Sequence, residues 1–228
     1  MQQTALNLVA IGIFGITFLS LLTPFINIPP SVPAGMTLVI LVLGTIDTLA
    51  WQNRGVTLFL DFFASDRERE RVLHHEAGHF LVAYLLDIPV TGYTLTAWEA
   101  FKQGRSGNGG VIFDTDSLPK INKKTQEISL ITEKYCKVFM AGIAAEKFVY
   151  GAAEGGKDDR AVLRSALRSL GLSQQNCLLK ERTAQLQATT LIEENKVAYQ
   201  ALVSSMKDRK SVQDCYEKIK TSLVFSTK

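Results

Sequence analysis

The stretch Leu73-His74-His75-Glu76-Ala77-Gly78-His79-Phe80 decides how this sequence is interpreted, because it holds all three histidines of the 228-residue chain. On an α-helix, residues four apart lie on one face, so His75 and His79 can direct their imidazoles at one metal ion. Glu76 follows the first histidine and lies close enough to hold and deprotonate a water on that ion without being a ligand itself. The stretch therefore predicts a helix that carries a metal centre.

Residues 75–79 read H-E-x-x-H, the pattern of zinc-dependent peptidases. The alternatives are that the pattern occurs by chance or that the histidines are structural. Both are disfavoured because the chain has only three histidines and all of them lie here. The pattern predicts a catalytic zinc ion with His75 and His79 as two of its three protein ligands, and with Glu76 as the general base.

The residues around the motif predict where its helix begins and ends. Ser65 and Glu68 form the S-x-x-E capping box of a helix N-terminus, and Pro89 prevents the helix from continuing. The predicted helix covers about residues 66–87, polar in its first turns and buried over most of its second half. His74 points away from the metal-binding face and is interpreted as a bystander.

The N-terminal part of the chain has the composition of membrane-spanning segments. Residues 1–46 contain no Lys, Arg, Asp, Glu or His, and residues 6–26 form an apolar run long enough to cross a bilayer, which takes about 20 residues. A proline-containing break over residues 28–33 precedes a second run over residues 34–51, which only Asp47 interrupts. The short turn predicts a helical hairpin. A signal peptide is disfavoured because a basic region and a small-residue cleavage site are absent.

The distribution of basic residues predicts the orientation of this hairpin. Its turn has no Lys or Arg, whereas four arginines follow the second run, so the positive-inside rule places the C-terminal part on the cytoplasmic side or its stromal equivalent. Residues 55–63 are apolar but short, and we expect them to lie on the membrane surface or to link the hairpin to a globular domain. The four arginines are Arg54, Arg67, Arg69 and Arg71.

Composition and short motifs disfavour several other functions. Three separated cysteines, Cys136, Cys177 and Cys215, fit a reducing compartment rather than a disulfide framework. A net charge of +3 is too small to predict nucleic-acid binding. Residues 151–158 match G-x-x-x-x-G-K, but a phosphate-binding loop needs Ser or Thr where Asp158 stands and a strand before it, so no nucleotide is expected.

The third zinc ligand must be a carboxylate from outside the motif helix, since no fourth histidine exists. Glu99 lies twenty residues beyond His79, a distance that suits peptidases whose third ligand is a glutamate on the next helix. However, residues 89–96 alternate like a β-strand, which leaves no helical hairpin to return Glu99 to the site. Further along, residues 123–150 have helical periodicity, and the loop 152–159 ends in two aspartates before another helix.

Four segments follow one another in the order typical of a known family. They are His75-Glu76-Ala77-Gly78-His79, Pro89-Val90, Gly142-Ile143-Ala144-Ala145-Glu146-Lys147 and Glu154-Gly155-Gly156-Lys157-Asp158-Asp159. With these segments the chain, over about residues 65–205, resembles the peptidase domain of FtsH-type membrane-bound zinc metalloproteases. The family pattern is H-E-A-G-H, a P-V strand, G-G-R-A-A-E-E and T-G-A-S-N-D, and the last aspartate of that pattern binds zinc.

The resemblance implies that Asp159 is the third zinc ligand, with Asp158 as the next candidate. The competing interpretation of both residues is an acidic helix N-terminus. The chain departs from the family pattern at Ile143, where the family has arginine, and over residues 154–158. FtsH-type proteins also carry an ATPase domain between membrane segments and peptidase, whereas residues 51–65 leave no room for one here.

We therefore expect a mainly α fold (α+β), in which a transmembrane helical hairpin precedes a helical zinc-peptidase domain with a small β-hairpin. The expected domains are a membrane anchor over residues 1–54, a linker over residues 55–64 and an FtsH-like peptidase domain over residues 65–228. The β-hairpin is expected to join residues 92–98 to residues 110–113. The C-terminal third is expected to be helical.

The expected function is that of a membrane-anchored zinc metalloendopeptidase that needs no ATPase of its own. It would hydrolyse membrane or unfolded proteins, whose extended segments would add to the edge of the β-hairpin. The expected partners are protein substrates, the membrane, and either further copies or a separate ATPase-bearing FtsH-type subunit. The resemblance implies a plasma or thylakoid-type membrane. The alternatives are an inactive FtsH-like scaffold and a site-2-type intramembrane protease, whose motif lies within a transmembrane helix.

Overall fold

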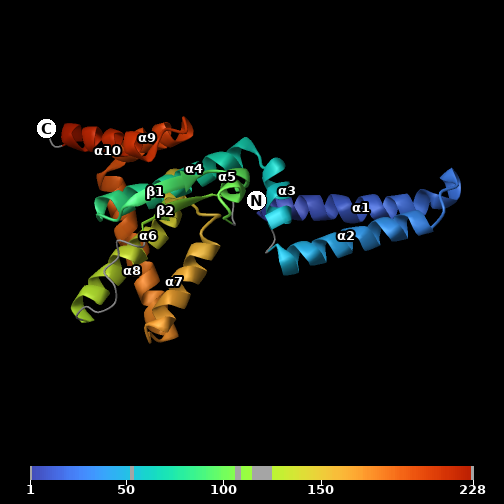
Figure 1. The fold of residues 1–228 in the computed structure, drawn as a ribbon, viewed down its shortest axis with the longest axis horizontal. Helices are drawn as coiled ribbons and strands as arrows, with labels where there is room; N and C mark the ends of the chain where they lie inside the picture. Colours follow the sequence, from blue (N-terminus) through green and yellow to red (C-terminus); the bar gives the residue numbers. More distant parts are fainter. Residues whose placement is uncertain (1, 52–53, 106–108, 115–124, 227–228) are drawn as a thin grey trace. The chain divides into compact units, whose positions relative to one another are not determined.

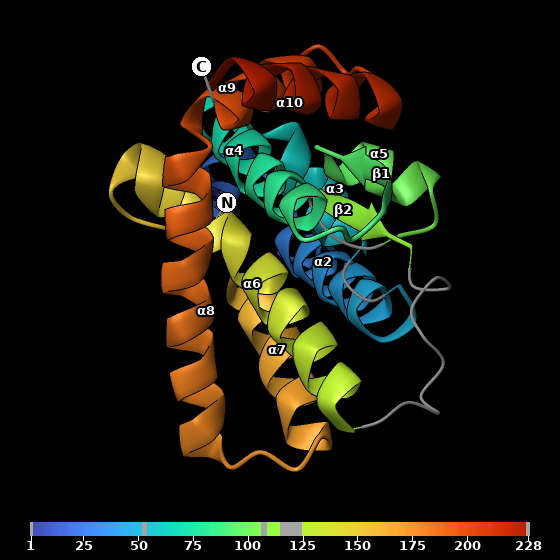
Figure 2. The same cartoon turned by 90° about the vertical axis from the view of Figure 1, so that its left-hand side faces the viewer.

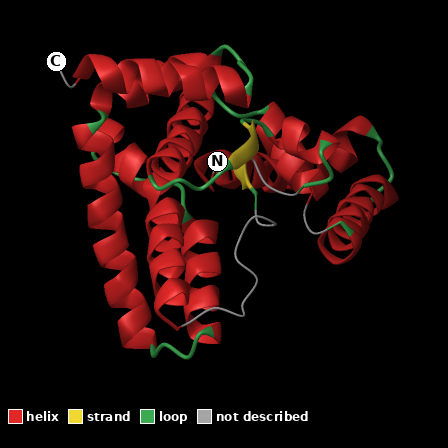
Figure 3. Ribbon diagram, turned by 60° about the vertical axis from the view of Figure 1, so that its left-hand side comes forward, coloured by secondary structure: helices red, strands yellow, loops and turns green. Residues whose placement is uncertain are grey.

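The computed structural model describes residues 2–51, 54–105, 109–114 and 125–226 of the chain. By contact density the chain forms two compact units. The first unit contains residues 1–69 and 96–108, and the second contains residues 70–95 and 109–228. Helices dominate both units, and the strands form one two-stranded sheet (Figure 1, Figure 3). This confirms the predicted fold class.

The first unit contains four complete helices and the first turn of a fifth. The four are α1 (Gln2–Ile26), α2 (Ser31–Ala50), α3 (Arg54–Phe62) and α5 (Ala97–Lys102). The second unit contains the rest of that fifth helix, the sheet and five further helices. They are α4 (Asp66–Leu85), β1 (Val90–Thr94), β2 (Gly110–Phe113), α6 (Thr125–Tyr150), α7 (Lys157–Ser169), α8 (Gln174–Glu194), α9 (Lys196–Lys207) and α10 (Val212–Ser226).

Helices α1 and α2 run side by side as the predicted hairpin (Figure 1). Residues 6–26 and 31–50 are long and apolar enough to cross a membrane, judged by length and composition. Asp47, near the end of α2, is 7% exposed. Its carboxylate accepts hydrogen bonds from the backbone N–H groups of Gly55 at 2.7 Å and Val56 at 2.8 Å. The acidic residue that interrupts the apolar run therefore satisfies free donors at the start of α3.

The prediction that residues 92–98 form one strand of the hairpin is wrong at its C-terminal end. Strand β1 stops at Thr94, and α5 begins at Ala97. The side chain of Thr96 accepts a hydrogen bond from the backbone N–H of Glu99 at 3.1 Å, which is a helix N-cap. The pairing partner was predicted correctly, because β1 pairs antiparallel with β2. The connection between the strands thus carries a short helix.

The capping box at the start of α4 is confirmed. The backbone N–H of Glu68 donates to Ser65 Oγ at 3.2 Å, and the Glu68 carboxylate accepts from the Ser65 backbone N–H at 3.0 Å. The helix ends at Leu85, two residues before the predicted limit, and Asp87 follows in the left-handed region with φ of 56°. The observed helix therefore matches the predicted one closely.

Small residues allow α4 and α6 to cross closely. A Cβ on Gly78 would lie 2.6 Å from the carbonyl oxygen of Ala141 and 2.6 Å from the Cβ of Ala145. Only a glycine leaves room for the α6 backbone at this point. Because α4 carries the motif histidines, this close crossing determines which part of α6 lies beside them.

The remaining helices of the second unit enclose α4 and α6. Helix α8 packs along α6, with α7 beside both (Figure 2). The pair α9 and α10 contributes two aromatic side chains to the core. Tyr199 is 1% exposed and hydrogen-bonds His74, while the Tyr216 ring lies 5.6 Å from that of Phe80. The C-terminal helices therefore support the back of the motif helix.

Candidate metal centre

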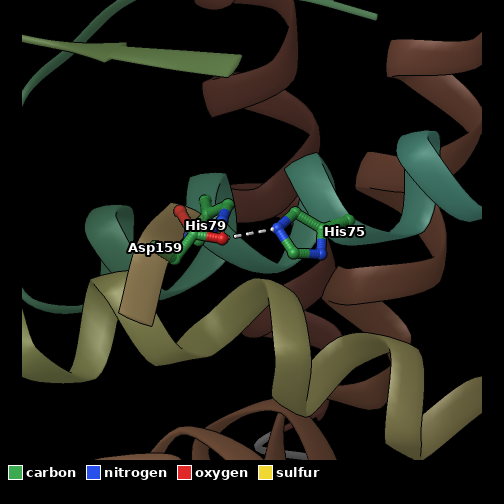
Figure 4. A group of neighbouring side chains, drawn as sticks. All are labelled: His75, His79 and Asp159. Carbon is green, nitrogen blue, oxygen red and sulfur yellow. Dashed lines mark hydrogen bonds and ion pairs between the residues drawn. The ribbon is translucent and has the colours of Figure 1, made fainter. Parts of the chain in front are cut away.

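Three side chains with metal-binding atoms lie together in the second unit (Figure 4). His75 and His79 come from α4, and Asp159 comes from the first turn of α7. One ligand atom from each residue can be chosen so that all three atoms lie within 4.8 Å of one another. Asp159 Oδ2 is 3.0 Å from His75 Nε2 and 3.6 Å from His79 Nε2. The three ligand atoms therefore converge on one point.

Each histidine is oriented by a hydrogen bond at its other ring nitrogen. Nδ1 of His79 donates to the carbonyl oxygen of Val138 at 2.7 Å, which leaves Nε2 directed at Asp159. Nδ1 of His75 lies 2.8 Å from Oε1 of Glu146 on α6. Such contacts fix the tautomer and ring orientation of metal-binding histidines.

Glu146 connects the His75 ring to the loop that precedes Asp159. Its side chain is 2% exposed, and its Oε2 accepts from Arg71 Nη1 at 2.8 Å. It also accepts hydrogen bonds from the backbone N–H groups of Glu154 at 2.9 Å and Gly155 at 3.1 Å. One carboxylate therefore holds both a candidate ligand and the segment that carries another.

Arg71 strengthens this arrangement from the motif helix. Its guanidinium donates to the carbonyl oxygen of Ala152 at 3.3 Å and lies 4.5 Å above the ring of Tyr150. It also pairs with Glu154 at 3.2 Å. Although the sequence predicts polar first turns for α4, Arg71 is only 7% exposed. The arginine therefore belongs to the interior of the site.

The loop over residues 154–158, which departs from the FtsH pattern, is compatible with the placement of Asp159. Gly156 has φ of 81° and is the residue before α7, so a left-handed backbone brings the chain into that helix. A Cβ on Gly156 would overlap the side chain of Ile143, which is fully buried. Ile143 and the loop over residues 154–158 are two places where the chain departs from the FtsH pattern. Ile143 thus packs directly against this loop.

Glu76 lies beside the three converging side chains, with one carboxylate oxygen free to act. The residue is 7% exposed, and its Oε2 has no hydrogen-bond partner among the described residues. The carboxylate accepts a hydrogen bond from the backbone N–H of Val111 on β2. Burial raises the pKa of Glu76, and the nearby histidines oppose that effect. A buried carboxylate with an open oxygen is suited to proton transfer.

The charges of the site are strongly coupled. Burial lowers the pKa of His75, but its hydrogen bonds to Asp159 and Glu146 outweigh burial and raise that pKa to about 10. Burial raises the pKa of Glu146, yet His75, the Glu154 N–H and Arg71 bring it down to about 2. Burial likewise opposes the lowering of the Asp159 pKa, which the two histidines produce. The carboxylates of Glu146 and Asp159 are therefore ionised, and the Asp159 carboxylate is the one that faces both motif histidines.

The donor set fits a catalytic zinc ion. Two imidazoles and one carboxylate provide three protein ligands, the number that leaves a further position for water or substrate. The Oε2 atom of Glu76 is buried near these three residues and has no hydrogen-bond partner among the described residues. A water bound to the ion could supply that hydrogen bond. Both imidazoles are held at their other ring nitrogen, as metal-binding histidines usually are.

Other residues weighed from the sequence lie elsewhere. Asp158 is exposed in the first turn of α7 and is not part of the converging group. Glu99 lies on α5, which belongs to the first unit. His74 is not part of the converging group, and its ring hydrogen-bonds Tyr199 at 2.8 Å, which joins α4 to α9.

Sequence reasoning missed the roles of Glu146 and Arg71. A signal for Glu146 was present in the sequence, because this acidic residue directly follows the apolar run Met140-Ala141-Gly142-Ile143-Ala144-Ala145. A buried carboxylate in such a run needs a partner. Arg71 had no comparable signal, since its neighbours Arg67 and Arg69 have the same residue type on the same helix.

The nucleotide-binding alternative for residues 151–158 loses further support from the hydrogen bonds of this loop. A phosphate-binding loop surrounds its ligand with free backbone N–H groups. Here the N–H groups of Glu154 and Gly155 donate to Glu146. These two donors are therefore already used by a carboxylate of the protein.

Comparison with known proteins gives one distant similarity. No protein-family model matches the chain. A region of 109 residues, 46% of this chain, is 32% identical to the ATP-dependent zinc metalloprotease FtsH 1 of Methylacidiphilum infernorum (isolate V4). The similarity covers 16% of the length of that relative. It supports an FtsH-like peptidase region and suggests a zinc metallopeptidase-like function.

Proposed function

We propose that this chain is a membrane-anchored zinc metalloendopeptidase. The convergence of His75, His79 and Asp159 beside the buried carboxylate of Glu76 carries the proposal. We assign the three converging residues as zinc ligands and Glu76 as the catalytic residue. The distant similarity to a zinc metalloprotease supports the same assignment.

The chemistry follows from these groups. A zinc ion held by His75, His79 and Asp159 would lower the pKa of water to about 7 and polarise a carbonyl group. Glu76 takes a proton from the attacking water through its open Oε2 and then donates it to the leaving amine of the cleaved peptide. Burial of Glu76 favours the protonated form in between, because desolvation disfavours the charged carboxylate.

We propose that substrates bind as an added strand along β2. The backbone N–H of Val111 faces Glu76, and a Cβ on Gly109 would lie 3.5 Å from Glu76 Oε1, so the start of β2 runs beside the catalytic carboxylate. Strand β1 occupies the opposite edge of β2. Among the described residues, no strand pairs with the other edge of β2, which we call its free edge. A peptide that pairs with this edge would bring its backbone, whatever its sequence, next to Glu76.

The proposal divides the chain into a membrane anchor at residues 1–54, a connecting segment at residues 55–64 and a peptidase domain from residue 65. We propose a two-pass membrane protein whose catalytic domain faces the cytoplasm or stroma. Its substrates are membrane or unfolded proteins, and it acts alone, as an oligomer or with a separate ATPase-bearing subunit. The H-E-x-x-H motif lies on α4, outside both apolar helices, which argues against a site-2-type protease.

The test compares the full-length protein with its Glu76→Gln variant in detergent or nanodiscs. Glutamine keeps the size of the side chain but cannot act as a base, so cleavage of an unfolded casein should fall by about a hundredfold to ten-thousandfold. Zinc content, measured by mass spectrometry of the metal, should stay near one ion per chain in both proteins. The Asp159→Asn variant should lose zinc and cleavage together.

Two results would contradict the proposal. Wild-type protein that binds zinc and cleaves nothing would favour the inactive FtsH-like scaffold. Cleavage that survives Glu76→Gln at the wild-type rate would show a contaminating protease or another site. The Glu154→Gln variant is a matched control, because its side chain is 61% exposed and it should keep both zinc and activity.

A further inference from the structure

The first unit exposes an unusual number of aromatic side chains outside its two long apolar helices. On α3 and the residue after it, Phe59, Phe62 and Phe63 are 56%, 79% and 47% exposed. On α5, Trp98 and Phe101 are 53% and 42% exposed. Among the residues of the second unit whose exposure the structure describes, no phenylalanine or tryptophan is exposed. Its exposed large hydrophobic residues are Leu130, Val149, Val162, Leu170, Leu179, Leu186, Val197 and Val224.

The polarity of α3 is reversed relative to an ordinary surface helix. Val56, Phe59 and Phe62 recur every third residue, so they share the exposed face. The polar residues face the protein instead. Asp61 accepts a hydrogen bond from the backbone N–H of Ala97 at 3.2 Å, and Arg54 donates to the carbonyl oxygen of Gly104 at 3.1 Å. Helices that meet water place these two kinds of residue the other way round.

Helix α5 repeats this reversal. Its small residues Ala97 and Ala100 are 2% and 1% exposed, whereas the rings of Trp98 and Phe101 stack 5.8 Å apart on the outside. The amine of Lys102 lies 5.3 Å from the centre of the Trp98 ring. The outward surface of α5 thus combines large aromatic rings with a positive charge.

Both helices belong to the unit that contains the apolar hairpin. Helix α2 has 20 residues, which corresponds to about 30 Å, the thickness of the hydrocarbon core. Asp47 holds the first turn of α3 at the end of α2 through two hydrogen bonds. Figure 1 shows α3 running across the direction of α1 and α2. Helix α3 therefore begins where a hairpin that spans the bilayer leaves its hydrocarbon core.

We propose that the outward face of α3 and α5, formed by Val56, Phe59, Phe62, Trp98 and Phe101, lies in the interfacial layer of the bilayer. Its occupant is the headgroup and upper acyl region of the lipids. Aromatic rings concentrate at this depth, and helices with one apolar face lie in the plane of this layer. The amine of Lys102 suits anionic headgroups.

This inference rests on the hairpin crossing a membrane and is independent of peptidase activity. It gives residues 55–64 a role beyond that of a linker. Because α5 stands in the connection between β1 and β2, the chain would enter the interfacial layer once before the motif helix and once within the sheet connection. The second entry follows from the short helix that replaces the expected end of a strand.

The test uses tryptophan fluorescence of the full-length protein in vesicles of phosphatidylcholine and phosphatidylglycerol. The chain has two tryptophans, so Trp51→Phe leaves Trp98 as the sole reporter. Lipids brominated near the top of the acyl chain should quench the Trp98 emission, because a ring at the interface lies at the depth of the bromine atoms. The emission should also be blue-shifted, and iodide should quench it weakly.

Two further reporters serve as controls. Trp98→Phe leaves Trp51, at the end of α2, which should be quenched by the same lipids if the hairpin crosses the bilayer. Leu186→Trp in a protein without the native tryptophans places a ring on a 68% exposed position of α8, where iodide but not brominated lipid should quench it. Exchanging Phe59 and Phe62 for serine should reduce the lipid quenching of Trp98 while circular dichroism stays unchanged.

Three outcomes would overturn the proposal. Quenching of Trp51 without quenching of Trp98, together with strong iodide quenching of Trp98, would place the α5 face in water. Blue-shifted Trp98 emission that brominated lipid leaves unchanged would show that protein covers the face, either a second copy or another chain. Absence of lipid quenching at both tryptophans would show that the hairpin of α1 and α2 does not cross the bilayer, and the inference rests on that crossing.

Discussion

At the scale of single residues, Glu146 is the most informative part of the site. It is not one of the three candidate zinc ligands, and it does not hydrogen-bond Oε2 of Glu76. Instead it holds the His75 ring, the backbone of the following loop and the guanidinium of Arg71 at the same time. Removing its charge should therefore affect the metal through His75 rather than the chemistry directly.

We predict that Glu146→Gln weakens zinc binding by about 10- to 100-fold, the usual effect of losing a carboxylate that orients a metal-binding histidine. The amide can still accept from His75, but it no longer balances the charge of Arg71. A competition titration against a chromogenic chelator measures the change. Glu154→Gln provides the control, because it removes an exposed partner of Arg71 and leaves the Glu146–His75 contact in place. Equal affinities for wild type and Glu146→Gln would refute the assigned role.

At the scale of secondary structure, the site depends on how closely α4 and α6 cross. Gly142 on α6 faces the His75 ring, and an added Cβ would overlap its Nε2, the atom that points at Asp159. The position tolerates no side chain unless the ring moves. The metal centre is therefore sensitive to a methyl group on a helix that contributes no ligand.

We predict that Gly142→Ala weakens zinc binding by more than tenfold, because the ring must leave the position that the other ligands require. Alanine favours a helix over glycine by about 1 kcal/mol, so loss of folding is not the expected cause. Zinc titration with circular dichroism of the same samples separates the two effects. Gly44→Ala, where an added Cβ meets no atom within 4 Å, should change neither quantity. Wild-type zinc affinity in Gly142→Ala would show that the ring has room to move.

A second prediction at this scale concerns the free edge of β2. Strand addition uses backbone hydrogen bonds on every second residue of the peptide, so N-methylation of alternate amides should block cleavage in one register. Methylation of the other set of amides should leave cleavage nearly intact. Mass spectrometry of the products from both peptide series measures the difference. Equal cleavage of the two series would exclude binding of substrate as a strand.

The sequence predicted these elements unevenly, for physical reasons. The capping box at Ser65 and the apolar hairpin depend on local pattern, and both are confirmed. The strand predicted over residues 92–98 failed because the alternation of Thr and apolar residues continues into Thr96, whose hydroxyl caps α5. The convergence of Asp159 with the histidines followed from a family resemblance. The contacts of Glu146 and Arg71 depend on the helix crossing and could not be read from spacing.

At the scale of the whole molecule, the chain combines an apolar hairpin with a region that is similar to part of FtsH, and only residues 51–65 separate α2 from α4. An unfoldase normally supplies a peptidase with extended chains. The proposed substrate site accepts only extended backbone, so a folded domain would not fit beside Glu76.

We predict that the purified full-length protein cleaves an unfolded casein without ATP and leaves a stably folded domain intact. Addition of ATP and magnesium should leave the rate unchanged, since the loop over residues 151–158 uses its N–H groups on Glu146. Gel assays over time, with the Glu76→Gln protein as a blank, measure both rates. A rate that rises with ATP would contradict the assignment and indicate nucleotide binding or a copurified ATPase.

The position of Asp159 in the sequence has a further consequence for the stability of the chain before and after it binds metal. It follows His79 by 80 residues and lies in the first turn of a different helix, so a shared ion would act as a removable cross-link that closes a long loop. Cross-links of this span restrict the unfolded chain far more than the folded one. A newly made copy would therefore be easiest to degrade before it acquires its metal. Binding of the metal would then protect the folded chain from degradation.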